Sequence, residues 1–281
     1  MIEVVSGGMY TSIQDLGRFG YRKFGVPLSG AMDSYSARLA NRLLGNEREA
    51  AVMEITHIGP VLKFSTATEI AITGAGFLPT LNNVEIPLNT RVYIPSNSVL
   101  KFGLPVYGLR AYISIAGGFT SERVLGSFSQ YPRITTTDTL EKGDRILIPV
   151  FNKIPTRTTA SVKVDKHHFT SEVLKVNPGP EFENLSKSIQ KKIFETSLVI
   201  SPESNRMAYL LNGWDSLSAK EIITAPVQPG TVQLTPSGQS VILMRDAQTT
   251  GGYSRILQLT ESAINILAQK RAGTQVRFEF N

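Results

Sequence analysis

The sequence predicts a mainly β protein with two β-rich halves and a few short helices. Short strand-like runs alternate with turns along most of the 281 residues, which include 23 glycines and 15 prolines. Only three segments repeat apolar residues at helical spacing, and two sets of short motifs recur in the same order. Many short strands punctuated in this way are typical of β-barrels and sandwiches.

The expected strands are short runs bounded by Gly, Pro, Asn or Ser, a pattern that indicates extended structure. They cover residues 2–5, 61–64, 69–73, 91–94, 111–115, 145–150, 173–176, 232–235, 241–244, 256–259 and 276–280.

The first predicted helix covers residues 33–44, where the apolar side chains fall on one helical face. Asp33 or Ser34 is expected to cap its start. Gly45 suits the left-handed position that follows a helix end. An unpaired helix start can also bind an anion, but capping by Asp33 is the favoured interpretation.

Two more helices are expected in the second half. One carries an apolar stripe along residues 185–194, with Ser186 as its cap. The other begins after Thr260 and is expected to reach Lys270. Glu261 in its first turn and Lys270 at its end match the order that the helix dipole favours.

A repeated set of motifs suggests that the two halves are related. In the first half, a Ser-x-Arg motif precedes a Leu-Leu-Gly motif and a Gly-x-Val strand, and the second half has similar motifs in the same order. The paired segments are residues 36–45 and 204–213, 59–64 and 230–234, and 142–148 and 272–278.

The predicted halves are residues 1–151 and 172–281, each a β-rich unit. Residues 152–171 between them are polar and predict a connector or an exposed hairpin. A groove between two such halves is a natural ligand site.

Composition excludes several classes of protein. Without cysteine there is no disulfide scaffold, zinc ribbon, thiol nucleophile or iron–sulfur cluster. The three histidines have no carboxylate spacing that suggests a metal site. The net charge of +6 comes from scattered residues, which argues against a nucleic-acid partner. The start of the sequence lacks signal-peptide features and no apolar run spans a bilayer, so a soluble cytoplasmic protein is expected.

An early polar stretch, residues 11–20, follows a predicted strand and carries chemically useful groups. Gln14, Asp15 and Arg18 lie within five positions, beside glycines that allow sharp turns. The planar guanidinium of Arg18 suits a carboxylate or phosphate. An Asp15–Arg18 pair that fixes the loop is an equally good interpretation.

A late polar loop is the second candidate. After the apolar strand at 241–244, Asp246 is a candidate acid or base. Gln248 and Arg255 are candidates for binding an amide or carboxylate. Two glycines and Tyr253 lie between them. This density of polar groups favours a functional loop over a structural turn.

No known nucleotide or nucleophile motif is present. The sequence has no phosphate-binding P-loop, no Gly-x-Ser-x-Gly elbow and no Gly-x-Gly-x-x-Gly between a strand and a helix. The Met-Lys-Met context of biotinyl lysine is also absent, so no covalent biotin is expected on this chain.

Several long motifs resemble the allophanate-hydrolase-subunit-2-like family. The resemblance covers essentially the whole chain except residues 152–171. Its motifs lie at residues 11–20, 25–33, 111–118, 177–181, 204–207, 230–233 and 246–255.

This resemblance implies two tandem cyclophilin-like β-barrels. It also implies the role of the C subunit in an ATP-dependent 5-oxoprolinase. Such a hydrolase complex contains two partners, a B subunit of related barrel fold and an A subunit, and it opens 5-oxo-L-proline to L-glutamate with ATP hydrolysis. The resemblance leaves open a carboxyltransferase half acting on urea or a related amide with carboxybiotin from another chain. It also leaves open a regulatory module that binds a histidine-kinase inhibitor related to the B subunit.

A lactam-opening site must hold a carboxylate, an amide and phosphates. Under the resemblance, Arg18, Arg206 and Arg255 are expected to bind anionic groups. The backbone of Gly251 and Gly252 is expected to approach a phosphate.

The same resemblance gives expectations for the amide and for proton transfer. Gln14, Gln248 and Thr250 are expected to contact the amide. Asp15 or Asp246 is expected to steer protons. Whether ATP contacts this chain is left open.

Overall fold

The computed structural model describes residues 1–150, 162–214 and 217–281. The chain forms two compact units, of which the first comprises Met1–Gly17 and Ser29–Lys166. The second comprises Arg18–Leu28 and His167–Asn281, so an early segment belongs to the later unit. Of the predicted connector, residues 152–161 lie outside the described residues, and its end contains the short helix α2 (His167–Thr170).

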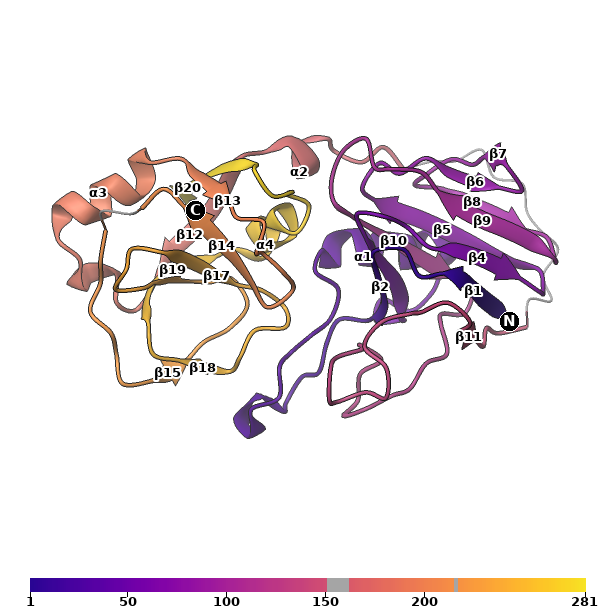
Figure 1. Cartoon of the computed structure of the whole chain (residues 1–281), viewed down its shortest axis with the longest axis horizontal. Helices are drawn as coiled ribbons and strands as arrows, with labels where there is room; N and C mark the ends of the chain where they lie inside the picture. Colours follow the sequence, from indigo (N-terminus) through magenta and orange to yellow (C-terminus); the bar gives the residue numbers. More distant parts are fainter. Residues whose placement is uncertain (151–161, 215–216) are drawn as a thin grey trace. The chain divides into compact units, whose positions relative to one another are not determined.

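The first unit contains two antiparallel sheets (Figure 1). In order across the first sheet, the strands are β11 (Arg145–Ile146), β1 (Ile2–Ser6), β4 (Val61–Phe64), β9 (Ser98–Phe102), β6 (Pro79–Leu81) and β7 (Val84–Glu85). The second sheet has the order β2 (Tyr10–Gln14), β3 (Val52–Thr56), β10 (Arg110–Ile115), β5 (Thr68–Gly74) and β8 (Arg91–Ile94).

Apolar side chains from both sheets form one core. Leu62 and Phe64 of the first sheet join Ile55, Ile72 and Ile113 of the second in this cluster, and all are fully buried. Burying such side chains is the main stabilising contribution to folding. The alternation along β4 explains the expected strand there, because Leu62 and Phe64 point inward while Lys63 is exposed.

Helix α1 (Ser34–Leu44) packs against β5 and β10. Its start is capped as the sequence predicts, since the Asp33 carboxylate accepts hydrogen bonds from the backbone nitrogen and hydroxyl of Ser36. Gly45 ends it in the left-handed conformation, with φ of 70°.

A buried polar network holds the loop that leads into α1. The Glu54 carboxylate accepts hydrogen bonds from the Met32 backbone nitrogen at 2.7 Å and from the Tyr112 hydroxyl at 2.8 Å. The Asp33 backbone nitrogen donates in turn to the Tyr112 hydroxyl oxygen. Burial, followed by the nearby Glu54 carboxylate, raises the pKa of Tyr112 well above its usual value, so the phenol stays protonated.

The second unit is a closed barrel (Figure 1). Its strands follow the order β12 (Val173–Pro178), β19 (Ser254–Leu259), β16 (Thr231–Leu234), β17 (Ser240–Leu243), β14 (Ala208–Asn212), β13 (Leu198–Ile200) and β20 (Gln275–Phe280). The barrel closes through a parallel pairing of β12 with β20, and a short ribbon pairs β15 (Ala225–Pro226) with β18 (Thr250–Gly251).

Two helices of the barrel unit begin where the sequence predicts. The Ser186 side chain caps α3 (Lys187–Glu195), and the Thr260 side chain caps α4 (Glu261–Leu267). The expected extension of α4 to Lys270 is wrong, because the helix ends at Leu267. The Lys270 ammonium is instead buried and donates to the carbonyl oxygen of Phe169 in α2 at 2.7 Å.

The mainly β prediction is confirmed, but one repeat pairing is wrong. The Ser-x-Arg motif of the first half lies in helix α1, whereas the corresponding motif of the second half leads into strand β14. The two similar Ser-x-Arg sequences therefore adopt different secondary structures. The two Gly-x-Val motifs do form similar structures, since each leads into a strand, β4 in the first half and β16 in the second.

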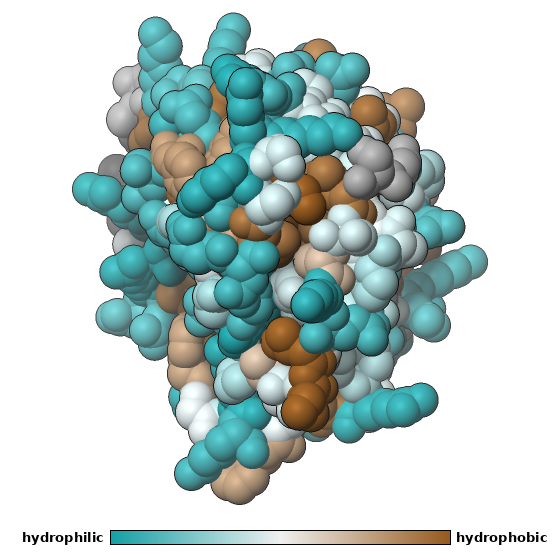
Figure 2. All heavy atoms as spheres, turned by 90° about the vertical axis from the view of Figure 1, so that its left-hand side faces the viewer, coloured by the Kyte–Doolittle hydropathy of each residue, from teal (hydrophilic) through white to brown (hydrophobic). Residues whose placement is uncertain are grey.

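The surface around α3 is mostly hydrophilic. Figure 2, which presents this side of the barrel unit, shows hydrophilic side chains interrupted by small hydrophobic groups. Across the described ranges, no helix is long and apolar enough to cross a membrane.

Candidate functional site

The early predicted residues Gln14 and Asp15 lie in the first unit, at the end of β2. The Gln14 side chain is fully buried, and its amide nitrogen donates to Ser12 Oγ and to the Gln130 carbonyl oxygen. Its Oε1 has no hydrogen-bond partner within the described residues. Gln14 is thus held at one end of its amide only.

The Asp15 carboxylate holds two loops together. It accepts hydrogen bonds from the backbone nitrogens of Gly17 and Phe128 and from the hydroxyls of Ser127 and Ser129, at 2.7–2.8 Å. These four hydrogen bonds fix the carboxylate between the two loops, which favours a positioning role for this side chain. A role in proton transfer stays a prediction.

Arg206 and Asp246 of the barrel unit contact each other. The Arg206 Nε donates to Asp246 Oδ2 at 2.7 Å, and its Nη2 donates to Oδ1 at 3.2 Å. Both side chains are only 9% exposed. The ion pair joins the loop before β14 to the turn after β17, so each charge is largely neutralised by the other.

Arg255 is engaged in a second ion pair, with Glu181. Its Nε and Nη2 donate to the two carboxylate oxygens at 2.9 and 2.7 Å, and its Nη1 donates to the Pro226 carbonyl oxygen. The side-chain hydrogen bonds from Arg255 lower the pKa of Glu181, and Glu181 raises the pKa of Arg255 in return. Glu181 belongs to one of the predicted motifs, but nothing in the sequence indicates this contact.

This pair predicts a change of stability with pH. The ordinary pKa of Glu181 is 4.5, and its folded-state value is lower. Glu181 therefore contributes stability above that ordinary value, and this contribution is lost as pH falls through the lower folded-state pKa. Denaturant unfolding of wild type and Glu181→Gln, from about pH 7 to about pH 3, should show a difference that shrinks in acid.

The control for this prediction is Glu183→Gln. Glu183 forms an exposed pair with Lys187, with side chains 75% and 83% exposed, and its replacement should change the free energy of unfolding little. A Glu181→Gln effect that stays constant over the whole pH range would contradict the prediction.

The late loop presents polar groups at the barrel surface. Gln248 and Thr250 are exposed, and Tyr253 is 40% exposed. Gly251 and Gly252 are half-buried; a Cβ on Gly251 would lie 2.7 Å from Gln233 Nε2, at the end of a side chain, and one on Gly252 would lie 3.3 Å from the Ile222 carbonyl oxygen. Contact of either glycine with a phosphate stays a prediction.

Arg18 begins the segment that belongs to the barrel unit. Its side chain is fully buried, and its backbone nitrogen donates to the Leu28 carbonyl oxygen at 2.7 Å. This bond closes the base of a loop whose tip is the short 3-10 helix η1 (Arg22–Phe24). The loop thereby brings Arg22, which was not predicted as a site residue, to the barrel unit.

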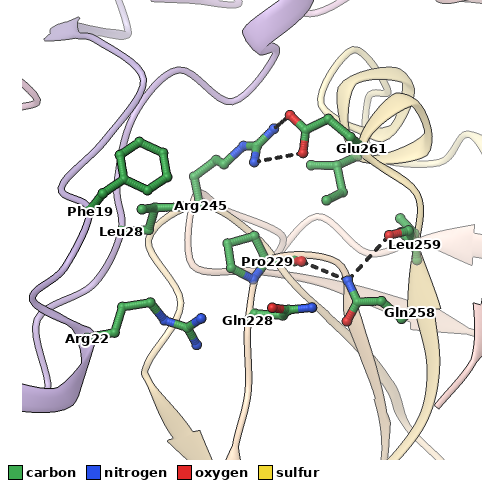
Figure 3. Close-up of a pocket in the computed structure, with 10 residues that line it drawn as sticks. Phe19, Arg22, Leu28, Gln228, Pro229, Arg245, Gln258, Leu259 and Glu261 are labelled. Atoms are coloured by element: carbon green, nitrogen blue, oxygen red, sulfur yellow. Dashed lines mark hydrogen bonds and ion pairs between the residues drawn. The ribbon is translucent and has the colours of Figure 1, made fainter.

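A pocket of about 390 Å³ lies between this loop and the barrel (Figure 3). Its apolar lining consists of Phe19, Leu28, Pro229, Leu259 and Ile264. Its polar lining consists of Arg22, Arg245, Gln228, Gln258 and Glu261. None of the predicted site residues lines this pocket. Two lining arginines are close to them in sequence, since Arg245 directly precedes Asp246 and Arg22 lies four residues after Arg18.

The pocket has an excess of positive charge. Arg245 pairs with Glu261, with 2.6 Å from Nη2 to Oε1 and 3.3 Å from Nη1 to Oε2. Two arginines and one glutamate leave one net positive charge in the lining. This charge matches a small monoanion. Over the described residues, no cluster of three or more potential ligands could hold a metal ion.

Comparison with known proteins identifies the family. Residues 24–280 match the carboxyltransferase domain, subdomains A and B. The chain belongs to the carboxyltransferase domain family. The resemblance inferred from the motifs is thus confirmed, and it extends through both units of this carboxyltransferase-family chain.

Relatives within this family differ in how much of the chain they match. The C subunit of the 5-oxoprolinase of Escherichia coli is 32% identical over 284 residues, which is 99% of this chain and 90% of that protein. The urea amidolyase of Saccharomyces cerevisiae is 46% identical over 131 residues, which is 46% of this chain and 7% of that protein. The second match is therefore higher in identity but limited to part of the chain.

A solved structure shares the fold. The crystal structure of TTHA0988 superposes with a TM-score of 0.89 at 28% identity and covers 99% of this chain. The match accounts for 55% of that chain, so this protein spans about half the length of its structural relative.

Proposed function

We propose that this protein is the C subunit of an ATP-dependent 5-oxoprolinase that opens 5-oxo-L-proline to L-glutamate together with the A and B subunits. The observation that carries the proposal is the correspondence with a 5-oxoprolinase C subunit over 99% of this chain and 90% of the relative. A match of that extent includes both units and the loop that bears Arg22.

The chemistry explains why the reaction is coupled to ATP hydrolysis. Ring opening breaks a lactam C–N bond, which is a stable amide bond, and ATP hydrolysis by the complex supplies the driving force. The pocket of the barrel unit supports a role for this chain in binding and orienting a small anionic substrate. Its walls combine apolar side chains with a few polar groups, as is usual for small-molecule sites.

The test is a reconstitution from purified components. Mixing this chain with its A and B partners, 5-oxoproline and ATP should release glutamate and ADP, and leaving out any one component should stop the release. Glutamate release that continues at the same rate without this chain would overturn the proposal.

A carboxyltransferase role with urea is the second candidate, favoured by the 46% identity to urea amidolyase over part of the chain. The same mixture supplied with urea and a carboxybiotin donor distinguishes the two. Consumption of urea, with no glutamate from 5-oxoproline, would favour the second candidate.

A further inference from the structure

The pocket of the barrel unit contains an arginine whose charge is not used by the fold. Within the described residues, the Arg22 guanidinium has no hydrogen bond or ion pair with another side chain. Figure 3 shows it directed into the pocket, toward Gln228. A half-buried guanidinium is a strong partner for a carboxylate, because it can donate two parallel hydrogen bonds.

A second donor in the lining also lacks a partner. Arg245 is 7% exposed, and its Nη atoms are taken up by Glu261 and Asn265. Its Nε has no hydrogen-bond partner in the described part of the chain. Because this atom is enclosed by protein, the Arg245 side chain forms part of the pocket wall, and Arg22 is the arginine of the lining that a ligand can reach.

The two glutamines of the lining differ in their availability. Gln258 donates to the carbonyl oxygens of Pro229 and Leu259 and accepts from Thr231 Oγ1, so its amide is part of the wall. Gln228 is held only through its backbone, by two hydrogen bonds with Thr231. The exposed Gln228 amide is therefore free to pair with both the donor and the acceptor of another amide.

These features define a ligand of one chemical class. One net positive charge suits a monocarboxylate, the Gln228 amide suits a neighbouring amide, and the apolar wall of Phe19, Leu28 and Pro229 suits a compact ring. The volume of about 390 Å³ lies at the lower end of the range for ligand pockets.

We propose that this pocket binds the carboxylate of a small cyclic amide acid through Arg22 and its amide through Gln228. The identity of the ligand rests on the proposed function, under which 5-oxoproline is the cyclic amide acid that this pocket binds. Arg22 and Gln228 are substrate-binding residues in this assignment, and the Arg206–Asp246 and Arg255–Glu181 pairs hold the surrounding loops.

The test compares Arg22→Met with Arg48→Met in the reconstituted complex. Both substitutions remove one positive charge, but Arg48 is exposed and lies outside the pocket. Arg22→Met should raise the KM for 5-oxoproline about tenfold or more, and Arg22→Lys should raise it less. Pyrrolidinone, which lacks the carboxylate, should inhibit wild type and Arg22→Met equally.

Equal KM values for Arg22→Met and Arg48→Met in an active complex would overturn the assignment, as would loss of pyrrolidinone inhibition in Arg22→Met. If the wild-type complex releases no glutamate, the proposed function fails, and calorimetric binding of 5-oxoproline to the full chain decides the inference separately. Binding by wild type that Arg22→Met weakens supports the pocket. Equal binding by both, or none by either, contradicts it.

Discussion

Asp246→Asn is expected to destabilise the barrel unit by about 3 kcal/mol or more, because removing one charge of a buried ion pair leaves the other poorly compensated. The two side chains are 9% exposed and share two hydrogen bonds. Denaturant unfolding measures this loss directly. The matched control is Glu183→Gln, which breaks a pair with side chains at least 75% exposed and should cost less than about 1 kcal/mol.

The same variant separates a structural role of Asp246 from proton transfer. If the ion pair is structural, the double variant Arg206→Met/Asp246→Leu should recover part of the lost stability, because no charge is left buried. Activity of the complex should recover with it. An Asp246→Asn chain that is as stable as wild type but inactive would contradict the structural account and favour a role as acid or base.

Gly179→Ala is expected to cost about 3 kcal/mol, at the upper end of the usual effect of overpacking. A Cβ at this position would clash with the Arg255 carbonyl oxygen and lie 2.7 Å from the Ile256 carbonyl carbon, both backbone atoms. The end of β12 would have to move away from β19. The Gly179 backbone hydrogen bond to Ile256 and the Glu181–Arg255 pair would then lengthen.

Gly103→Ala is the control for this prediction. Its new Cβ would meet only Leu78 atoms at 3.4 Å, an ordinary contact, and the effect should stay within about 0.5 kcal/mol. Unfolding curves and soluble yield compare the two variants. Similar stability of Gly179→Ala and Gly103→Ala would contradict the close packing at Gly179.

Local signals explain what the sequence could predict. The caps at Asp33, Ser186 and Thr260 are predictable because a capping side chain acts within three residues of its own position. Strand β4 is predictable because its core-facing side chains alternate with exposed ones. The early end of α4 is not, because Lys270 is held by a contact with Phe169, far away in the sequence.

Long-range contacts explain what remained hidden. The parallel pairing that closes the barrel joins β12 to β20, and nothing in either strand specifies that partner. The candidate arginines Arg206 and Arg255 stand out by residue type, but their carboxylate partners are known only from the fold. Arg22 has no comparable signal in the sequence. It reaches the pocket only because the loop Arg18–Leu28 belongs to the same unit as His167–Asn281, and that association is a long-range feature of the fold.

A crystal structure of this chain, alone or in its complex, with bound 5-oxoproline tests the central claim most directly. The account predicts ligand density in the pocket, with the carboxylate within hydrogen-bond distance of the Arg22 guanidinium and the ring amide beside Gln228. Ligand density beside Arg255 or Asp246, with either ion pair opened to receive it, would contradict the account.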